Sequence, residues 1–191
     1  MFKKMRDYSH EEFVKLVMQL SEEQLLELSS NYGGYPVLFR MALDERICHI
    51  PFIQTGSSVI VRNENGEILL QQCSDNGRWG LPGGCQDLGE DLRATAVREL
   101  YEETGIKVNV EELILIDTIS GERRKRIYPN GDIVYNNSSL YLVDVNSDDI
   151  NIKIDSESIK LEFFDINCLP YEMHDGDLIE TYIKFIKGKS R

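Results

Sequence analysis

Residues 83–106, GGCQDLGEDLRATAVRELYEETGI, bring more chemically useful groups together than any other stretch of this chain. Two glycines open a short loop, which leads into a pattern typical of a helix. Asp91 is a good residue to cap the first turn of that helix, and Gly105 is a good residue to end it after Thr104. We therefore expect a helix from about Asp91 to Thr104, around which the rest of the chain is organised.

The predicted helix has two chemically different faces. At 100° per residue, and with Glu99 set at zero, Glu102 falls at about 300° and Glu103 at about 40°, so the three carboxylates share one face. Apolar side chains fall on the other side, between about 100° and 220°: Ala94, Val97, Leu100 and Tyr101. We expect the helix to bury the apolar face and to present an acidic cluster on the other.

This acidic cluster has the composition of a divalent-metal site. Carboxylates three and four residues apart repel each other on a helix, and a cation would relieve that repulsion. Mg²⁺ and Mn²⁺ favour carboxylate and carbonyl oxygens, and the carbonyl of Gly84 could be a further ligand because glycine lets the backbone approach closely. Arg98 is placed to orient the carboxylates, with Glu90 as its partner across the loop. Without a metal, the pattern would be an ordinary amphipathic helix with a solvated acidic face.

The spacing of these residues resembles a known signature. From Gly84 to Ile106 the pattern is Gly-x5-Glu-x7-Arg-Glu-Leu-x-Glu-Glu-x-Gly-Ile, which is similar to the Nudix box of the Nudix hydrolases. The preceding residues 79–84, WGLPGG, also resemble the approach to that box. The resemblance covers roughly residues 55–188 and leaves out the N-terminal region.

The resemblance implies a fold and a reaction. The fold would be α/β, a Nudix-type α/β/α sandwich around a mixed β-sheet. The reaction would be a pyrophosphatase reaction, in which water attacks phosphorus in a nucleoside diphosphate linked to a group X, with Mg²⁺ or Mn²⁺ as cofactor. A nucleoside diphosphate sugar such as ADP-ribose is one expected substrate, and (d)NTPs and dinucleoside polyphosphates are the alternatives. A catalytically silent nucleotide-binding sensor module is the alternative to an enzyme, although such a relative would be expected to lose glutamates that this chain keeps.

The resemblance also implies roles for individual residues. The metal ligands would be Glu99, Glu102, Glu103 and the carbonyl of Gly84, with Glu90 and Arg98 in support. The acceptor of the water's proton stays open among four carboxylates: Glu99, Glu102, Glu122 and Glu157. The chain departs from many relatives at Asp87, where they have Glu, and at Cys73, where they have Arg; the second departure could remove a phosphate contact and leaves the substrate more open.

Candidate substrate contacts lie outside the box. Residues 123–126 form a basic run in an acidic chain. From this run Arg126 could reach phosphates, as could Arg78 from an earlier loop, and Tyr128 could stack on a base. The alternative for the basic run is a solvated strand edge of the kind that protects sheets from aggregation.

The flanking segments alternate between strand and helix patterns. Strands are expected over residues 57–61, 67–72, 106–118, 133–143 and 159–164, the first two being joined by a turn at 63–66. The dipeptide Asn130-Gly131 predicts a hairpin. Asp175 is placed to cap a last amphipathic helix. This alternation favours an α/β sandwich.

The first 50 residues have a different pattern. Capping boxes at 9–12 and 21–24, each followed by apolar residues at helical spacing, predict a small helical extension. It is too small to hold a core alone, so we expect it to pack on the main domain or on a second subunit, as in a possible homodimer. The predicted organisation is a helical extension over 1–50 and a Nudix hydrolase domain over 51–191.

Composition bounds the remaining possibilities. The chain has 191 residues and a formal net charge of −12, which disfavours nucleic acid and anionic membranes as partners. The partner that the family resemblance implies is a small-molecule nucleotide. No apolar run approaches the roughly 20 residues that span a bilayer, and no secretion signal is visible, so we expect a cytoplasmic protein. The four cysteines form no Cys-x-x-Cys pair, so neither a zinc site nor a disulfide framework is expected. The three histidines receive no role.

Overall fold

The structure is a computed structural model, and it describes residues 52–74, 76–127, 133–154 and 157–189, together with 15, 19 and 21. The unit treated below comprises Phe52–Ile127 and Val134–Arg191. Apart from those three isolated residues, the predicted helical extension lies outside the described residues, as do Tyr128 and the predicted turn at Asn130-Gly131.

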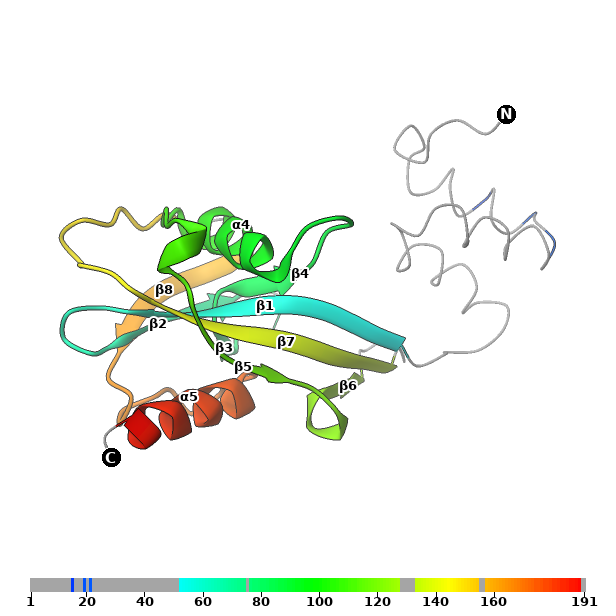
Figure 1. Cartoon of the computed structure of the whole chain (residues 1–191). Helices are drawn as coiled ribbons and strands as arrows, with labels where there is room; N and C mark the ends of the chain where they lie inside the picture. Colours follow the sequence, from blue (N-terminus) through cyan, green and yellow to red (C-terminus); the bar gives the residue numbers. More distant parts are fainter. Residues whose placement is uncertain are drawn as a thin grey trace. The chain divides into compact units, whose positions relative to one another are not determined.

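A mixed sheet forms the middle layer of this unit (Figure 1). Its strands are β1 (Phe52–Arg62), β2 (Ile68–Cys73), β3 (Trp79–Gly80), β4 (Gly83–Cys85), β5 (Ile114–Ile119), β6 (Lys125–Ile127), β7 (Ile133–Asp144) and β8 (Ser158–Phe164). The main path runs β3-β2-β1-β7-β5, and β4, β6 and β8 pair with β1, β7 and β2 respectively. Strands β1 and β7 are parallel, from the pair Phe52↔Val134 to the pair Arg62↔Asp144, whereas β2 and β4 run antiparallel to β1.

Two helices cover opposite faces of the sheet, α4 (Leu92–Thr104) and α5 (Gly176–Lys189), as Figure 1 shows. The alternation of side chains along β1 supplies both cores, because successive residues of a strand point to opposite faces. Val59 belongs to the core that contains Leu100 of α4, and its neighbour Ile60 belongs to the core that contains Leu178 of α5. The predicted α/β/α sandwich is therefore confirmed.

Each strand that the sequence predicts within the described residues is present, but two extents differ, and the short strands β3 and β4 were not predicted. The first strand, expected over 57–61, begins at Phe52. Residues 106–118 were expected to be strand, but β5 begins at Ile114 and is preceded by the short 3₁₀ helix η2 (Val110–Glu112). The reason is a capping box, in which the Glu112 carboxylate accepts a hydrogen bond from the backbone N–H of Asn109 at 2.5 Å. This local bond satisfies a backbone donor that a strand would have paired with its neighbour.

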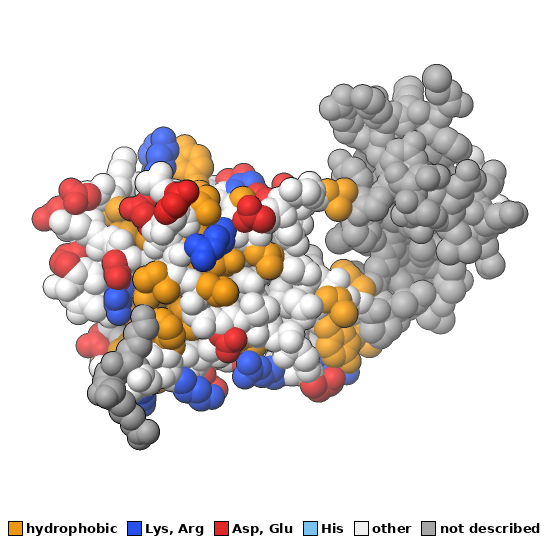
Figure 2. Space-filling model, in the orientation of Figure 1, with side chains coloured by type: hydrophobic (Ala, Val, Ile, Leu, Met, Phe, Trp, Pro, Cys, Tyr) orange, Lys and Arg blue, Asp and Glu red, His pale blue; other side chains and the backbone are white. Residues whose placement is uncertain are grey.

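The surface of this unit carries charged and hydrophobic side chains that are relevant to binding partners. On the face shown in Figure 2, acidic and basic side chains are interspersed, and hydrophobic side chains gather in the middle of the face. Exposed hydrophobic residues in this unit include Ile114 and Leu115 of β5. Among the helices that the structure describes, none is long and apolar enough to cross a membrane.

Candidate active site

The helix α4 has the caps that the sequence predicts. The Asp91 carboxylate accepts hydrogen bonds from the backbone N–H groups of Arg93 and Ala94, each at 2.9 Å. At the other end, Gly105 adopts the left-handed conformation with φ of 73°, and its N–H donates to the carbonyl of Tyr101. A residue with a Cβ would be strained at this φ, so the glycine fixes where the helix ends.

The buried face of α4 differs from the predicted one. Leu100 is fully buried as expected, but Tyr101 is 48% exposed and Glu103 only 9% exposed. The cause is the direction from which β1 and β4 approach the helix, which centres the buried stripe on Ala96 and Leu100 and brings Glu103 inside it. Tyr101 instead lies beneath the ammonium group of Lys107, 5.3 Å from the ring centroid.

Arg98 connects the glycine loop to two of the three glutamates of the box. Its Nε and Nη2 donate to the two carboxylate oxygens of Glu90, at 3.0 and 2.9 Å, as the sequence predicts. Nη1 donates to Glu99 at 2.8 Å and to Glu102 at 3.1 Å. Nη2 also donates to the carbonyl of Cys85 at 2.9 Å. One guanidinium therefore donates to three carboxylates and a backbone carbonyl of β4, and Asp87 lies 3.8 Å from its Nε.

These contacts shift the ionisation of the carboxylates in opposite directions. Hydrogen bonds from Arg98, with burial opposing them and a hydrogen bond from Thr95 assisting, lower the pKa of Glu90 to about 2. Burial raises the pKa of Glu99, and the negative charges of Glu102 and Glu157 raise it further, although Arg98 opposes the shift. Glu99 therefore carries its negative charge at a cost that one guanidinium does not fully offset.

The two glycines of the box bring the backbone of β4 against the other carboxylates. The N–H of Gly83 donates to the Glu103 carboxylate at 2.8 Å. A Cβ at Gly84 would lie 2.5 Å from the carboxylate carbon of Glu99, and a Cβ at Gly56 would lie 2.2 Å from the carbonyl oxygen of Gly84. Glu103 and Glu99 therefore approach β4 by different contacts, and glycine at position 84 leaves room for the carboxylate of Glu99.

The donor chemistry of this cluster fits a divalent cation, although the side chains are held by Arg98. In the part of the chain that the structure describes, no three His, Cys, Asp or Glu side chains are grouped as they would be around an ion. Glu99 and Glu102 converge instead on Nη1 of Arg98. Four carboxylates lie within ion-pair distance of this one guanidinium and leave a surplus of negative charge, and their oxygens are the hard ligands that Mg²⁺ and Mn²⁺ prefer.

A cavity of about 280 Å³ adjoins the cluster. Its lining comes from β2, β4, α4, the loops that follow β2 and β3, and the segments before β8 and α5: Gln71, Cys73, Ser74, Leu81, Gly83, Glu103, Glu157 and His174. Of the four carboxylates considered as acceptors of the water's proton, Glu157 lines this cavity, together with Glu103. Glu122 is exposed and pairs with Lys125 at 3.4 Å. His174 was given no role from sequence, because no local pattern marks it.

The three predicted substrate contacts have different outcomes. Arg126 donates to backbone carbonyls, at 3.0 Å to that of Lys125 and at 3.3 Å to that of His174, so its guanidinium holds loops together. Arg78 is exposed and is not among the residues that line the cavity. Tyr128 lies outside the described residues.

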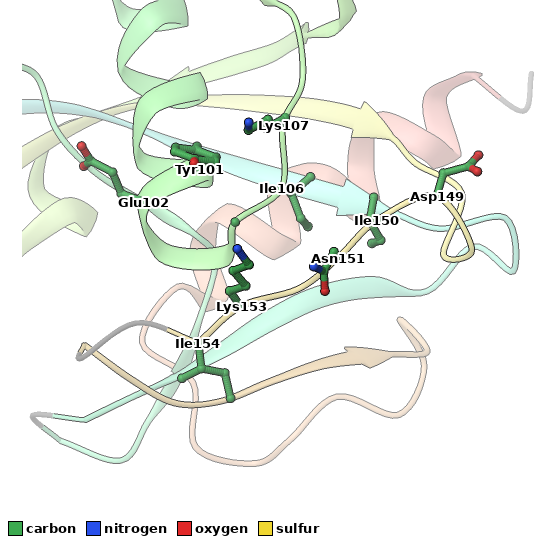
Figure 3. Close-up of a pocket in the computed structure, with 10 residues that line it drawn as sticks. Tyr101, Glu102, Ile106, Lys107, Asp149, Ile150, Asn151, Lys153 and Ile154 are labelled. Carbon is green, nitrogen blue, oxygen red and sulfur yellow. The ribbon is translucent and has the colours of Figure 1, made fainter.

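A second cavity, of about 510 Å³, lies at the C-terminal end of α4 (Figure 3). Tyr101, Lys107 and Lys153 line it, with Glu102 at its edge. In Figure 3 the carboxylate of Glu102 points away from the other labelled side chains. This cavity therefore does not bring the box glutamates together, and the smaller cavity is the one that adjoins Glu103.

The pair formed by Glu90 and Arg98 predicts a pH dependence of stability. The folded-state pKa of Glu90 is about 2, whereas an unfolded glutamate titrates near about 4.3. The stabilisation is therefore complete above about pH 4.5 and is lost as the pH falls towards about 2. We expect the difference in free energy of unfolding between wild type and Arg98→Gln, measured by urea denaturation, to shrink over this interval. A difference that is equal at both ends would contradict the assigned ion pair.

The comparisons with known proteins agree with this geometry. The NUDIX domain family matches residues 53–184, and the chain belongs to that family. An ADP-ribose pyrophosphatase from Methanocaldococcus jannaschii is 29% identical over 132 residues, which cover 68% of this chain and 72% of the relative. A MutT-like protein from Streptomyces ambofaciens is 36% identical over 77 residues, 40% of this chain and 50% of the relative.

Solved structures share the fold. The NUDIX domain of Shewanella oneidensis NrtR, in a complex with ADP ribose, is similar with a TM-score of 0.56 and 20% identity, over 71% of this chain and 89% of that one. The chain spans about half the length of the first two curated relatives that it matches, 50% and 51%. The predicted family membership is confirmed.

Proposed function

We propose that this protein is a metal-dependent pyrophosphohydrolase that cleaves a nucleoside diphosphate linked to a group X by attack of water at phosphorus. The observation that carries the proposal is the arrangement of the box: Arg98 holds Glu99 and Glu102, and the N–H of Gly83 holds the buried carboxylate of Glu103. Such a cluster concentrates negative charge on a rigid helix beside a cavity, which suits a site for cations and phosphates.

Nucleoside diphosphate sugars are the proposed substrate class, with ADP-ribose as the representative. Two observations support it: a relative named ADP-ribose pyrophosphatase aligns with 68% of this chain, and a solved NUDIX domain of the same fold is complexed with ADP ribose. (d)NTPs and dinucleoside polyphosphates stay the alternative substrates.

The proposed cofactor is Mg²⁺ or Mn²⁺, held by Glu99, Glu102, Glu103 and the carbonyl of Gly84. When bound, such an ion neutralises phosphate charge and makes a coordinated water more acidic. The chain's own residues do the positioning. Arg98 orients Glu99 and Glu102, and Glu90 fixes Arg98 through two hydrogen bonds.

Glu157 is the proposed acceptor of the proton that the attacking water loses. It lines the cavity together with Glu103, and its charge is felt by Glu99. Glu99 and Glu102 both accept hydrogen bonds from Arg98 and neither lines the cavity, so their oxygens are already engaged by the guanidinium. Glu122 does not line the cavity.

The direct test is a substrate panel with purified protein and Mg²⁺ or Mn²⁺. The panel contains ADP-ribose and other nucleoside diphosphate sugars, (d)NTPs and dinucleoside polyphosphates, and the products are separated by chromatography. We expect ADP-ribose to yield AMP and ribose 5-phosphate in the presence of metal and not with EDTA. Faster cleavage of another member would reassign the substrate. Binding of nucleotides without release of nucleoside monophosphate, orthophosphate or pyrophosphate from any of them would contradict the proposed activity and favour a sensor module.

A cytoplasmic location, a homodimer, and the division into an extension over 1–50 and a hydrolase domain over 51–191 stay predictions.

A further inference from the structure

His174 stands on the wall of the cavity that adjoins the box. Its side chain is about one-third exposed, at 31%. Its backbone is fixed on both sides, because its N–H donates to the carbonyl of Trp79 at 3.0 Å and its carbonyl accepts from Arg126 at 3.3 Å. The imidazole is therefore presented from a rigid position immediately before α5.

A buried carboxylate fixes the ring of His174. Nε2 lies 3.1 Å from Oδ2 of Asp175, which is 7% exposed. The sequence suggested Asp175 as a helix cap, and its backbone carbonyl does accept from the N–H groups of Leu178 and Ile179 in the first turn of α5. Its carboxylate, however, accepts from the backbone N–H of Leu81 at 3.1 Å and lies 3.5 Å from Nη1 of Arg124. The Asp175 carboxylate therefore contacts His174 and the loop after β3 and does not cap the helix.

Arg124 anchors this carboxylate from the other side. It is 5% exposed, and it donates to Ser138 and to Asp177, each at 2.9 Å. Burial of such charges is costly unless they are paired, so a chain of ion pairs runs from Asp177 through Arg124 and Asp175 to His174. Only the last member of that chain reaches the cavity.

The packing around the ring requires glycine at position 80. A Cβ at Gly80 would lie 2.2 Å from Nε2 of His174 and 2.9 Å from Oδ2 of Asp175. The backbone of β3 therefore closes one side of the ring and leaves Nδ1 as the nitrogen that is not bonded to a carboxylate. Nδ1 faces the sulfur of Cys73 at 3.9 Å, which is a long contact with a weak acceptor.

The electrostatic setting makes this imidazole a cation. The hydrogen bond to Asp175, assisted by the contact with Cys73 and opposed by burial, raises the pKa of His174 to about 10. Among the eight residues that line the cavity, His174 is the one with a positive charge, and Glu103 and Glu157 are negative. The cavity thus has a carboxylate side, suited to cations, and a single charged N–H donor suited to an anion.

We propose that His174 is a substrate-binding residue, whose Nδ1–H donates to an anionic phosphate oxygen of the nucleotide. The proposal rests on the proposed function for the identity of the nucleotide. His174 would then supply a phosphate contact from the segment before α5. Cys73 of β2, at the position where many relatives have Arg, has no charge with which to supply one. Asp175 is a positioning residue in this account, because it acts through His174.

The test compares His174→Gln, which keeps an N–H donor but removes the charge, with Lys184→Gln, which removes a charge from an exposed position of α5. Calorimetry measures the Kd of ADP-ribose in EDTA, where no turnover occurs, and steady-state kinetics with Mg²⁺ measures KM and kcat. We expect His174→Gln to raise both Kd and KM by about tenfold or more while kcat changes less than about threefold. Lys184→Gln should leave all three unchanged. Equal Kd values for wild type and His174→Gln would overturn the proposal.

A second measurement needs no variant. Iodoacetamide alkylates Cys73 when its thiolate attacks the methylene carbon and iodide leaves, and the exposed Cys168 reports the reference rate in the same sample. We expect ADP-ribose, and more weakly inorganic phosphate, to slow alkylation of Cys73 by at least about fivefold if a bound anion occupies the space beside His174. Equal rates with and without both ligands would overturn the proposal. Protein that protects Cys73 but hydrolyses nothing would contradict only the proposed function.

Discussion

Replacing Glu102 by glutamine is expected to reduce kcat for ADP-ribose by on the order of 10³-fold, the scale of loss when one preorganised group that stabilises transition-state charge is removed. The substitution keeps the size of the side chain and removes its charge. Because the Glu102 side chain is 56% exposed, we expect the free energy of unfolding to change by less than about 0.5 kcal/mol. Steady-state kinetics and urea denaturation measure the two effects on the same preparation.

Two further variants sharpen this comparison. Glu103→Gln keeps an oxygen that can accept from the N–H of Gly83, so we expect it to lose activity as Glu102→Gln does while staying folded. Glu180→Gln removes a charge from an exposed position of α5, away from the box, and should be fully active. Unchanged rates in both box variants would refute the assignment of Glu102 and Glu103 to the metal site.

Gly84→Ala is expected to lower the rate strongly while lowering the Tm only slightly. The new Cβ would lie 2.5 Å from the carboxylate of Glu99 and 2.6 Å from its Oε2. The end of a flexible side chain can move aside, so the Tm should fall by only a few degrees. The displaced carboxylate is the one proposed to hold metal, and a shift of about 1 Å in such a group can cost about 10²-fold in rate.

Two other glycines serve as references for this variant. Gly176 has open space around its Cβ position, so Gly176→Ala should change neither rate nor Tm. Gly83 has a φ of 152°, and a Cβ there would lie 2.2 Å from the carbonyl oxygen of Ser57, so Gly83→Ala should lower the Tm strongly. Full activity of Gly84→Ala at an unchanged Tm would show that the position of Glu99 is not required.

The central helix could be predicted from sequence because its determinants are local. Asp91 caps α4 and Gly105 ends it through contacts within a few residues, and the bond between Glu90 and Arg98 spans only eight positions. Helical angles alone did not give the buried face. They placed Tyr101 inside and Glu103 outside, and the approach of β1 and β4 reversed both.

The second half of the site could not be predicted from sequence because its contacts are long-range. His174 and Cys73 are 101 positions apart, and the bond from Leu81 to Asp175 spans 94. Asp175 fits the pattern of a helix cap, but burial gives its carboxylate stronger partners in His174 and Arg124. A local pattern does not show which acid a folded chain will bury beside a histidine.

The basic run at 123–126 was expected at the surface or at the substrate, and its actual contacts could not be predicted from sequence either. Its charges suggested phosphate contacts or a solvated strand edge, but the structure uses two of the four side chains in internal contacts, while Arg123 is exposed. Arg124 is buried in an ion pair with Asp177, and Arg126 donates to backbone carbonyls. An arginine offers five donors in a planar fork, so it can satisfy several buried acceptors at once, and composition alone does not reveal this use.

Titration with Mn²⁺, followed by electron paramagnetic resonance of the free ion, tests most directly whether the box is a metal site. Wild-type protein is expected to bind Mn²⁺, and Glu102→Gln is expected to bind it at least about tenfold more weakly because one carboxylate ligand is lost. Glu180→Gln should bind like the wild type. Equal Kd values for wild type and Glu102→Gln, or no binding by the wild type, would contradict the account, because Glu102 would then pair with Arg98 without serving as a metal ligand.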